Sequence, residues 1–152
     1  MAQAMFGAGC FWGVQDAFEK LDGVEETQVG YSGGKTDNPT YRQVCSGDTG
    51  HVEVVRVVFD EGKIGFGELL ACFFEIHDPT TLNRQGPDVG DQYRSVIFYY
   101  DDKQKELAQA ARKELDESGE LKRPVVTAVE PAQTFWIAED YHQHYHQRQC
   151  SI

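Results

Sequence analysis

The chain has 152 residues, of which 40% are hydrophobic and 26% are charged, as is typical of one folded domain rather than a disordered segment. It carries 14 basic and 25 acidic residues, a net charge of −11, which argues against nucleic acid or an anionic membrane surface as a partner. No apolar stretch approaches the roughly 18 residues of a membrane span. A signal or transit peptide requires basic residues near its start, and no basic residue precedes Lys20. We therefore expect a cytoplasmic protein.

Hydrophobic periodicity and turn residues divide the chain into strands and helices. The segment 51–59, HVEVVRVVF, is the strongest strand signal because it is rich in β-branched residues. In chain order we predict a strand at 1–6, a helix at 11–21, strands at 28–31 and 51–59, a helix at 66–77, a long loop at 82–93, a strand at 95–100, a helix at 102–118, a strand at 124–129 and a short helix at 138–147.

The first six elements follow the β-α-β-β-α-β order of the split βαβ, ferredoxin-like arrangement. The predicted fold is therefore α+β, a two-layer sandwich in which helices pack on a mixed sheet, with a coiled C-terminal tail. We expect residues 1–152 to form a single catalytic domain, with a flexible tail at about 147–152. Two stretches with little regular structure, 30–50 and 78–94, are long enough to suggest a functional role.

The cysteines are spaced too widely for a zinc ribbon or a thioredoxin-type motif, since no two form a C-x-x-C pair: they are Cys10, Cys45, Cys72 and Cys150. In a reducing compartment such thiols fill the core or do chemistry. Cys72 lies on the apolar stripe of a predicted helix and is expected to be inert, whereas the role of Cys45 stays open. Cys150 lies in a polar stretch near the C-terminus, and we favour the interpretation that it meets another sulfur.

Cys10 lies where a predicted strand meets a predicted helix, in the segment 7–13, GAGCFWG. The glycine spacing differs from a dinucleotide fingerprint, and two bulky aromatics stand where a pyrophosphate needs bare backbone. The partial positive charge and free N–H groups of a helix N-terminus favour a thiolate, the reactive form of cysteine. Position alone fits a buried residue in a tight turn equally well. Phe11 and Trp12 beside the sulfur favour an apolar substrate pocket.

Glu53 lies within the strand 51–59, and strand alternation puts it on the same face as Val55, Val57 and Phe59. A carboxyl on an apolar face is either part of a polar network at a sheet end or desolvated. Desolvation raises the pKa of a carboxylic acid and leaves it a proton to donate. Glu53 is therefore a candidate general acid.

The two long loops contain tyrosines and acids whose roles the pattern alone leaves open: Tyr31, Tyr41, Tyr93, Asp88 and Asp91. A tyrosine in a Gly-rich loop is more often an anchor packed on the domain than a catalytic group. Both aspartates are compatible with turn formation, and for Asp91 this is the better interpretation.

Three histidines, His142, His144 and His146, lie close together near the C-terminus. The spacing of His142 and His146 on a helix suits a metal. No Glu follows the first histidine as in H-E-x-x-H, however, and no third ligand is evident. We prefer a solvated helix face rich in Tyr and His, and we expect no metal and no cofactor.

Six segments in matching order resemble the peptide methionine sulfoxide reductase A family, over a range from about residue 5 to about residue 145. They are GCFWG (9–13), GYSGG (30–34), NPTYR (38–42), CSGDTGH (45–51), HDPT (77–80) and QYRS (92–95). The resemblance implies reduction of the S epimer of methionine sulfoxide, free or in peptides and proteins, with thioredoxin as the reductant. We expect a monomer.

The resemblance also implies roles for individual residues. Cys10 would attack the sulfoxide sulfur, and Glu53 would protonate the sulfoxide oxygen, helped by hydrogen bonds from Tyr41 and Tyr93. A sulfoxide oxygen is a poor leaving group until it is protonated, and general acid help of this kind contributes about 10²–10⁴ in rate. Attack would leave Cys10 as a sulfenic acid, which Cys150 would condense to a disulfide as the resolving thiol.

Three further residues would bind the substrate according to the resemblance. Phe11 and Trp12 would hold the S-methyl group, and Asp88 would hold the main-chain amide. Many family members carry two tail cysteines and this chain has one. Reductant would therefore attack the Cys10–Cys150 bond directly.

Two alternatives remain on the residues alone. A Cys–His hydrolase would pair Cys10 with a nearby histidine, and His51, on the Glu53 side of its strand, is the best candidate. Such an enzyme would not need Cys150. A metal-binding or thiol-based sensor would instead use the His-rich C-terminal segment.

Overall fold

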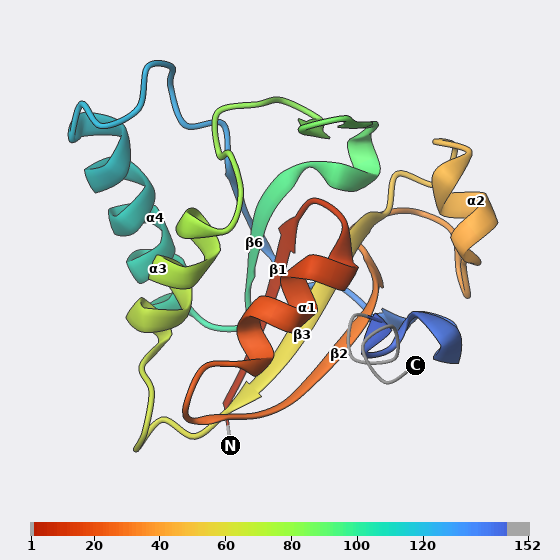
Figure 1. Cartoon of the computed structure of the whole chain (residues 1–152), viewed down its shortest axis with the longest axis horizontal. Coiled ribbons are helices and arrows are strands. Elements are labelled where there is room, and N and C mark those ends of the chain that lie inside the picture. Colours follow the sequence, from red (N-terminus) through yellow and green to blue (C-terminus); the bar gives the residue numbers. More distant parts are fainter. Residues whose placement is uncertain (1, 146–152) are drawn as a thin grey trace.

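The computed structural model describes residues 2–145. Its scaffold is a six-stranded sheet with the strand order β7-β6-β1-β3-β2-β8 (Figure 1). The strands are β1 (Ala2–Ala8), β2 (Val24–Ser32), β3 (Val52–Phe59), β6 (Ser95–Tyr99), β7 (Ala128–Pro131) and β8 (Trp136–Ile137).

The strand pairings confirm the predicted α+β class. The central strand β1 is antiparallel to β3 and β6, β2 is antiparallel to β3 and β8, and β6 and β7 run parallel, so the sheet is mixed. The inner strands β6-β1-β3-β2 have the order of a ferredoxin-like sheet. This order places β1 and β3 side by side. Cys10 follows the end of β1, and Glu53 lies within β3.

Helices cover one face of the sheet and enclose the larger core. They are α1 (Phe11–Glu19), α3 (Phe66–Glu75) and α4 (Asp102–Glu117), as Figure 1 shows. The ring of Phe6 stacks on Phe18 with centroids 5.0 Å apart and lies 5.3 Å from Phe73. A smaller core on the opposite face contains Met5 and Val54. Both sheet faces are therefore buried, which explains the nearly continuous apolar run of β3.

Most predicted elements are confirmed within a few residues, but the two loop-rich regions differ. Residues 30–50 contain a short helix, α2 (Tyr41–Cys45). Its N-cap Thr40 accepts a hydrogen bond from the Gln43 backbone N–H, and the Gln43 side-chain oxygen accepts one from the Thr40 N–H. The predicted loop at 82–93 contains a hairpin of β4 (Arg84–Gln85) and β5 (Asp88–Val89), followed by the 3₁₀ helix η1 (Asp91–Tyr93).

The C-terminal helix predicted at 138–147 is wrong over the described residues. After β8 the chain instead forms the short 3₁₀ helix η2 (Asp140–His142). His144 has a φ of 54°, a left-handed conformation that an α-helix does not accommodate. The predicted last strand also lies later than expected, at Ala128–Pro131. None of the helices in residues 2–145 has the length and apolar character to cross a membrane.

Candidate active site

Cys10 lies at the junction of β1 and α1, as the sequence predicts. Ala8 ends β1, Gly9 turns the chain with a φ of 97°, and Cys10 is the N-cap residue of α1. A Cβ at Gly9 would lie 2.8 Å from the Gln85 side chain. Glycine is therefore required both for the turn and for the close approach of the β4–β5 hairpin.

The pKa of Cys10 corrects one expectation. The backbone N–H groups of Trp12 and Gly13 lower it, as a helix N-terminus should. Burial raises it by more, and the negative charges of Glu53 and Asp88 add to the rise, so that the pKa of Cys10 is about 11. The resting sulfur is therefore a thiol at neutral pH, and the predicted thiolate is not its resting form.

Glu53 is buried in β3, on the helix-covered face that alternation predicts. Its side chain is 1% exposed, and Val55, Val57 and Phe59 on the same face belong to the larger core. The Glu53 Oε1 accepts a hydrogen bond of 3.2 Å from the backbone N–H of Phe11, the residue next to Cys10. Its Oε2 has no hydrogen-bond partner among the described residues.

Burial decides the protonation state of Glu53. Desolvation raises its pKa to about 8, the Phe11 N–H opposes this rise, and the Asp88 charge adds to it. The carboxyl group is therefore largely protonated at neutral pH. Because one oxygen is occupied by the Phe11 N–H, the other can carry a proton for a ligand.

Tyr41 and Tyr93 lie near enough to Glu53 to feel its charge, and they come from two separate short helices. Tyr41 opens α2 and Tyr93 ends η1. Burial raises the pKa of both phenols, with a further rise from the Glu53 charge, to about 12 for Tyr93 and higher for Tyr41. Both therefore remain O–H donors over the physiological pH range.

Asp88 reaches the same region from the β4–β5 hairpin. It is the first residue of β5, and its charge raises the pKa of Cys10, Glu53 and Tyr93. The hairpin thus brings an acceptor to the edge of the site. A carboxylate in this position is suited to accept a hydrogen bond from an amide N–H.

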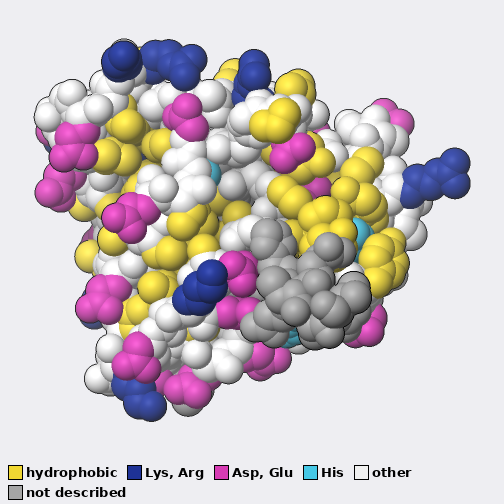
Figure 2. Space-filling model, in the orientation of Figure 1, with side chains coloured by type: hydrophobic (Ala, Val, Ile, Leu, Met, Phe, Trp, Pro, Cys, Tyr) yellow, Lys and Arg dark blue, Asp and Glu magenta, His cyan; other side chains and the backbone are white. Residues whose placement is uncertain are grey.

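Phe11 and Trp12 differ in their surroundings. Phe11 is fully buried, and its ring lies 5.7 Å from that of Tyr31 and 5.2 Å from that of His142. Trp12 is half-buried and donates its indole N–H to Nδ1 of His142 at 2.9 Å. Figure 2 shows hydrophobic side chains gathered on this face, in the region where Figure 1 places α1 and α2.

His142 is a site residue that the sequence reasoning misassigned. It is 1% exposed, so the predicted solvated face is wrong for this residue, although His144 is exposed as predicted. Its ring lies 4.4 Å from that of Tyr41. Burial lowers the pKa of His142, which keeps it neutral and able to accept the Trp12 N–H. The only sequence signal for this buried position would have been a histidine among aromatic residues spaced three or four positions apart.

Cys45, whose role was open, lies beside Tyr41. A hydrogen bond between the Tyr41 hydroxyl and the Cys45 sulfur raises the pKa of Tyr41 and lowers that of Cys45. Burial outweighs this effect and leaves the pKa of Cys45 raised. Cys150, the expected resolving thiol, and His146 lie outside the described residues.

His51 is not available as the base of a hydrolase. Its Nδ1 accepts the Gly34 backbone N–H at 3.0 Å, and its Nε2 lies 2.6 Å from the Thr36 carbonyl. Both ring nitrogens therefore hold the 33–36 turn, and neither remains for Cys10. Among residues 2–145, no three His, Cys, Asp or Glu side chains gather as a metal site would require.

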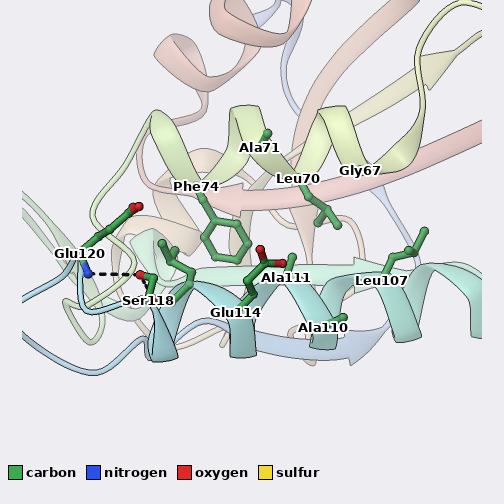
Figure 3. Close-up of a pocket in the computed structure, with 11 residues that line it drawn as sticks. Gly67, Leu70, Ala71, Phe74, Leu107, Ala110, Ala111, Glu114, Ser118 and Glu120 are labelled. Atoms are coloured by element: carbon green, nitrogen blue, oxygen red, sulfur yellow. Dashed lines mark hydrogen bonds between the residues drawn. The ribbon is translucent and has the colours of Figure 1, made fainter.

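A separate groove of about 450 Å³ runs between α3 and α4 (Figure 3). Leu70 and Phe74 extend from α3 toward Leu107 and Ala111 of α4. None of the candidate site residues lines it. The groove is therefore distinct from the cluster around Cys10.

Solved structures of similar fold first define the class of the protein. Mxr1 from Saccharomyces cerevisiae in reduced form has a TM-score of 0.91 at 36% identity, covering 99% of this chain and 87% of that one. Methionine sulfoxide reductase A of Corynebacterium diphtheriae has a TM-score of 0.85 at 37% identity, covering 97% and 74%. The fold is shared with a methionine sulfoxide reductase.

Sequence comparisons then give the family. The family described as peptide methionine sulfoxide reductase matches residues 2–151. The peptide methionine sulfoxide reductase MsrA of Methanothermobacter thermautotrophicus is 62% identical over 143 residues, which cover 94% of this chain and 85% of that protein. The MsrA of Methanoculleus marisnigri is 57% identical over 145 residues, covering 95% and 88%. The chain belongs to this family and is an oxidoreductase acting on methionine sulfoxide, as the resemblance predicted.

Proposed function

We propose that the protein reduces the S epimer of methionine sulfoxide, free or in proteins, with Cys10 as the nucleophile and Glu53 as the general acid. The arrangement of Glu53 carries this proposal. Its Oε1 is held by the N–H of the residue that follows Cys10, its Oε2 is without a partner in residues 2–145, and its pKa is about 8. A buried, protonated acid beside a cysteine supplies what sulfoxide reduction requires.

The reaction begins when the Cys10 sulfur attacks the sulfoxide sulfur and forms an S–S bond. Glu53 gives its proton to the sulfoxide oxygen, while Tyr41 and Tyr93 donate hydrogen bonds to that oxygen. The oxygen then passes to Cys10, the new S–S bond breaks, and methionine leaves as the thioether. Cys10 becomes a sulfenic acid, and the proton that its thiol gave up balances the one Glu53 supplied.

The same groups account for selection of one epimer. The sulfur of methionine sulfoxide is stereogenic, with a methyl group, an oxygen and the side chain around it. Phe11 and Trp12 would hold the methyl group, the donors would hold the oxygen, and Cys10 would approach from the remaining side. Asp88 would accept a hydrogen bond from the substrate's main-chain amide.

Regeneration would use Cys150. Its thiol condenses with the Cys10 sulfenic acid, which forms a disulfide and releases water. Thioredoxin would then reduce this disulfide and itself become oxidised. A solved structure of Mxr1 from Saccharomyces cerevisiae in complex with Trx2 supports such a partner. That chain is 25% identical to this one with a TM-score of 0.66, and the match covers 95% of this chain and 84% of that one.

The proposal is tested with the separate S and R epimers of a protected methionine sulfoxide and dithiothreitol. We expect turnover of the S epimer alone, none in Cys10→Ser, and a loss of about 10²–10⁴-fold in Glu53→Gln, which keeps the shape but cannot release a proton. Equal turnover of the R epimer would contradict the stereochemical assignment. Full activity of Glu53→Gln would contradict its role as the acid.

A further inference from the structure

The chain segment after β8 returns to the site from far along the sequence. Ile137 pairs with Gly30 of β2, and the Ala138 N–H donates to the Val29 carbonyl at 3.0 Å. These bonds fix the path of the chain on the edge of the sheet. They place the next residue, Glu139, between β2 and the start of α2.

Glu139 uses both carboxylate oxygens on neighbours of the site. Its Oε1 accepts the Tyr31 hydroxyl at 2.9 Å, and its Oε2 accepts the backbone N–H of Tyr41 at 3.0 Å. The Tyr141 hydroxyl lies 3.5 Å from Oε2 as a third, longer donor. Because several donors converge on one group, an ionised carboxylate is the side chain that satisfies them most strongly. Glu139 therefore ties the first residue of α2 to the sheet.

This tie is important because α2 has little else to hold it. The helix has five residues, and Val44 is its only fully buried side chain. The Tyr41 ring also contacts the ring of His142, which is tilted against it with the centroids 4.4 Å apart. The Tyr41 backbone and ring are thus both held by the segment 139–142. Tyr41 lies 98 residues before Glu139 in the sequence.

We infer that Glu139 is a positioning residue for Tyr41: its hydrogen bond to the Tyr41 backbone fixes the phenol where it can donate to the sulfoxide oxygen. This inference rests on the proposed role of Tyr41 as a donor. In residues 2–145 the Glu139 side chain bonds Tyr31, Tyr41 and Tyr141 rather than Cys10, and the inference gives it no contact with the substrate. Its loss should therefore slow the chemical step and leave the affinity for the sulfoxide, which depends on the methyl pocket, little changed.

The test is a double-mutant cycle between Glu139 and Tyr41. Single-turnover rates of S-sulfoxide reduction, measured without reductant and over a range of substrate concentrations, separate the chemical step from recycling by Cys150. We expect Glu139→Ala and Tyr41→Phe each to lower the limiting rate roughly tenfold or more, with a small change in the substrate concentration at half-maximal rate. Glu139→Ala should have no further effect in the Tyr41→Phe background.

Two matched variants separate positioning from folding. In Glu139→Gln the amide oxygen can still accept the Tyr41 N–H, and the Tyr31 hydroxyl can turn to accept from the amide, so this variant should keep most of the rate. Tyr31→Phe removes the Tyr31–Glu139 hydrogen bond and leaves Tyr41 held, so its rate should stay within about twofold of wild type. If Glu139→Ala does not fold, Glu139→Met fills a similar volume without an acceptor and replaces it in the cycle.

The outcomes also separate this inference from the proposed function. The inference would be overturned by a wild-type rate in Glu139→Ala, or by rate losses of Glu139→Ala and Tyr41→Phe that multiply in the double variant. The donor role of Tyr41 would still stand if Tyr41→Phe alone were slow. A wild-type rate in Tyr41→Phe would overturn the donor role and the inference together. A lower melting temperature with unchanged rates would show a purely structural role for Glu139 and would equally overturn the inference.

Discussion

The position of Glu53 follows from the alternation of side chains along a strand. Alternation along β3 places its carboxyl on the core face, and the structure confirms both the face and the burial. The raised pKa follows from that burial. The pKa of Cys10 did not follow from its position at a helix start, because burial and the two nearby carboxylates outweigh the helix N–H groups. The sum of these opposing effects depends on tertiary contacts that a local motif does not contain.

Burial of Glu53 should make stability depend on pH. The folded-state pKa is about 8 and the ordinary value is 4.5, so the folded protein holds this proton more tightly. The contribution is complete below pH 4.5 and is lost as pH rises through 8. Between these limits, wild type should lose roughly 3–5 kcal/mol of unfolding free energy relative to Glu53→Gln. Denaturant unfolding at pH 5 and pH 8.5 measures this; a constant difference between the two proteins would contradict it.

The thiol of free Cys10 should react slowly with iodoacetamide at neutral pH. Because its pKa is about 11, the alkylation rate should keep rising with pH well beyond the range of an ordinary cysteine, whose pKa is about 8.5. In Glu53→Gln the neighbouring charge is absent, and the midpoint should move to lower pH. Peptide mapping assigns the reaction to Cys10, and an unchanged midpoint in this variant would show that the two groups do not interact.

At the scale of elements, the sequence predicts the long strands and helices and misses the short ones. Nine or more residues carry a readable period, as in α1 and α3, whereas α2 has five residues and one buried side chain. Its start was nevertheless visible, since Thr40 and Gln43 have the spacing of a capping box. The helix predicted at 138–147 failed because hydrogen bonds to β2 and a left-handed residue override local helix propensity.

The cap of α2 should affect the reaction rather than global stability. Thr40→Val removes the hydroxyl that accepts a hydrogen bond from the Gln43 N–H. This should lower the local stability of α2 by about 1 kcal/mol and loosen the segment that carries Tyr41. We expect the single-turnover rate to fall up to about fivefold. Asp101→Ala is the matched control, because Asp101 caps α4 through the Gln104 N–H at 2.8 Å. It should lower the melting temperature and leave the rate unchanged; equal effects on rate would contradict a local role for Thr40.

For the whole molecule, the sequence order of elements was enough to predict the sheet class and its helical layer. It was not enough to predict the site, because the site joins the end of β1, the body of β3, α2, the β4–β5 hairpin and η2. These parts are far apart in the sequence and meet only in the folded chain. The resemblance to a family supplied Tyr41, Tyr93 and Asp88, which composition and spacing left open, whereas neither route pointed to Glu139 or His142.

The sheet scaffold and the site should respond independently to substitution. Phe6 is fully buried and contacts the rings of Phe18, Phe66 and Phe73. Phe6→Ala should lower the unfolding free energy by about 3–5 kcal/mol. Below its melting temperature, the epimer preference should be unchanged because no donor or methyl contact is lost. A variant that stays folded but reduces both epimers would contradict this separation.

In the proposed reaction, the Cys10 sulfur takes the oxygen of the sulfoxide. The most direct measurement is the mass of the intact protein and its peptides after treatment with the S-sulfoxide in the absence of reductant. We expect one equivalent of methionine, with a Cys10–Cys150 linkage two hydrogens lighter in wild type and one added oxygen on Cys10 in Cys150→Ser. Methionine formed while Cys10 keeps its original mass in both proteins would contradict the proposed reaction.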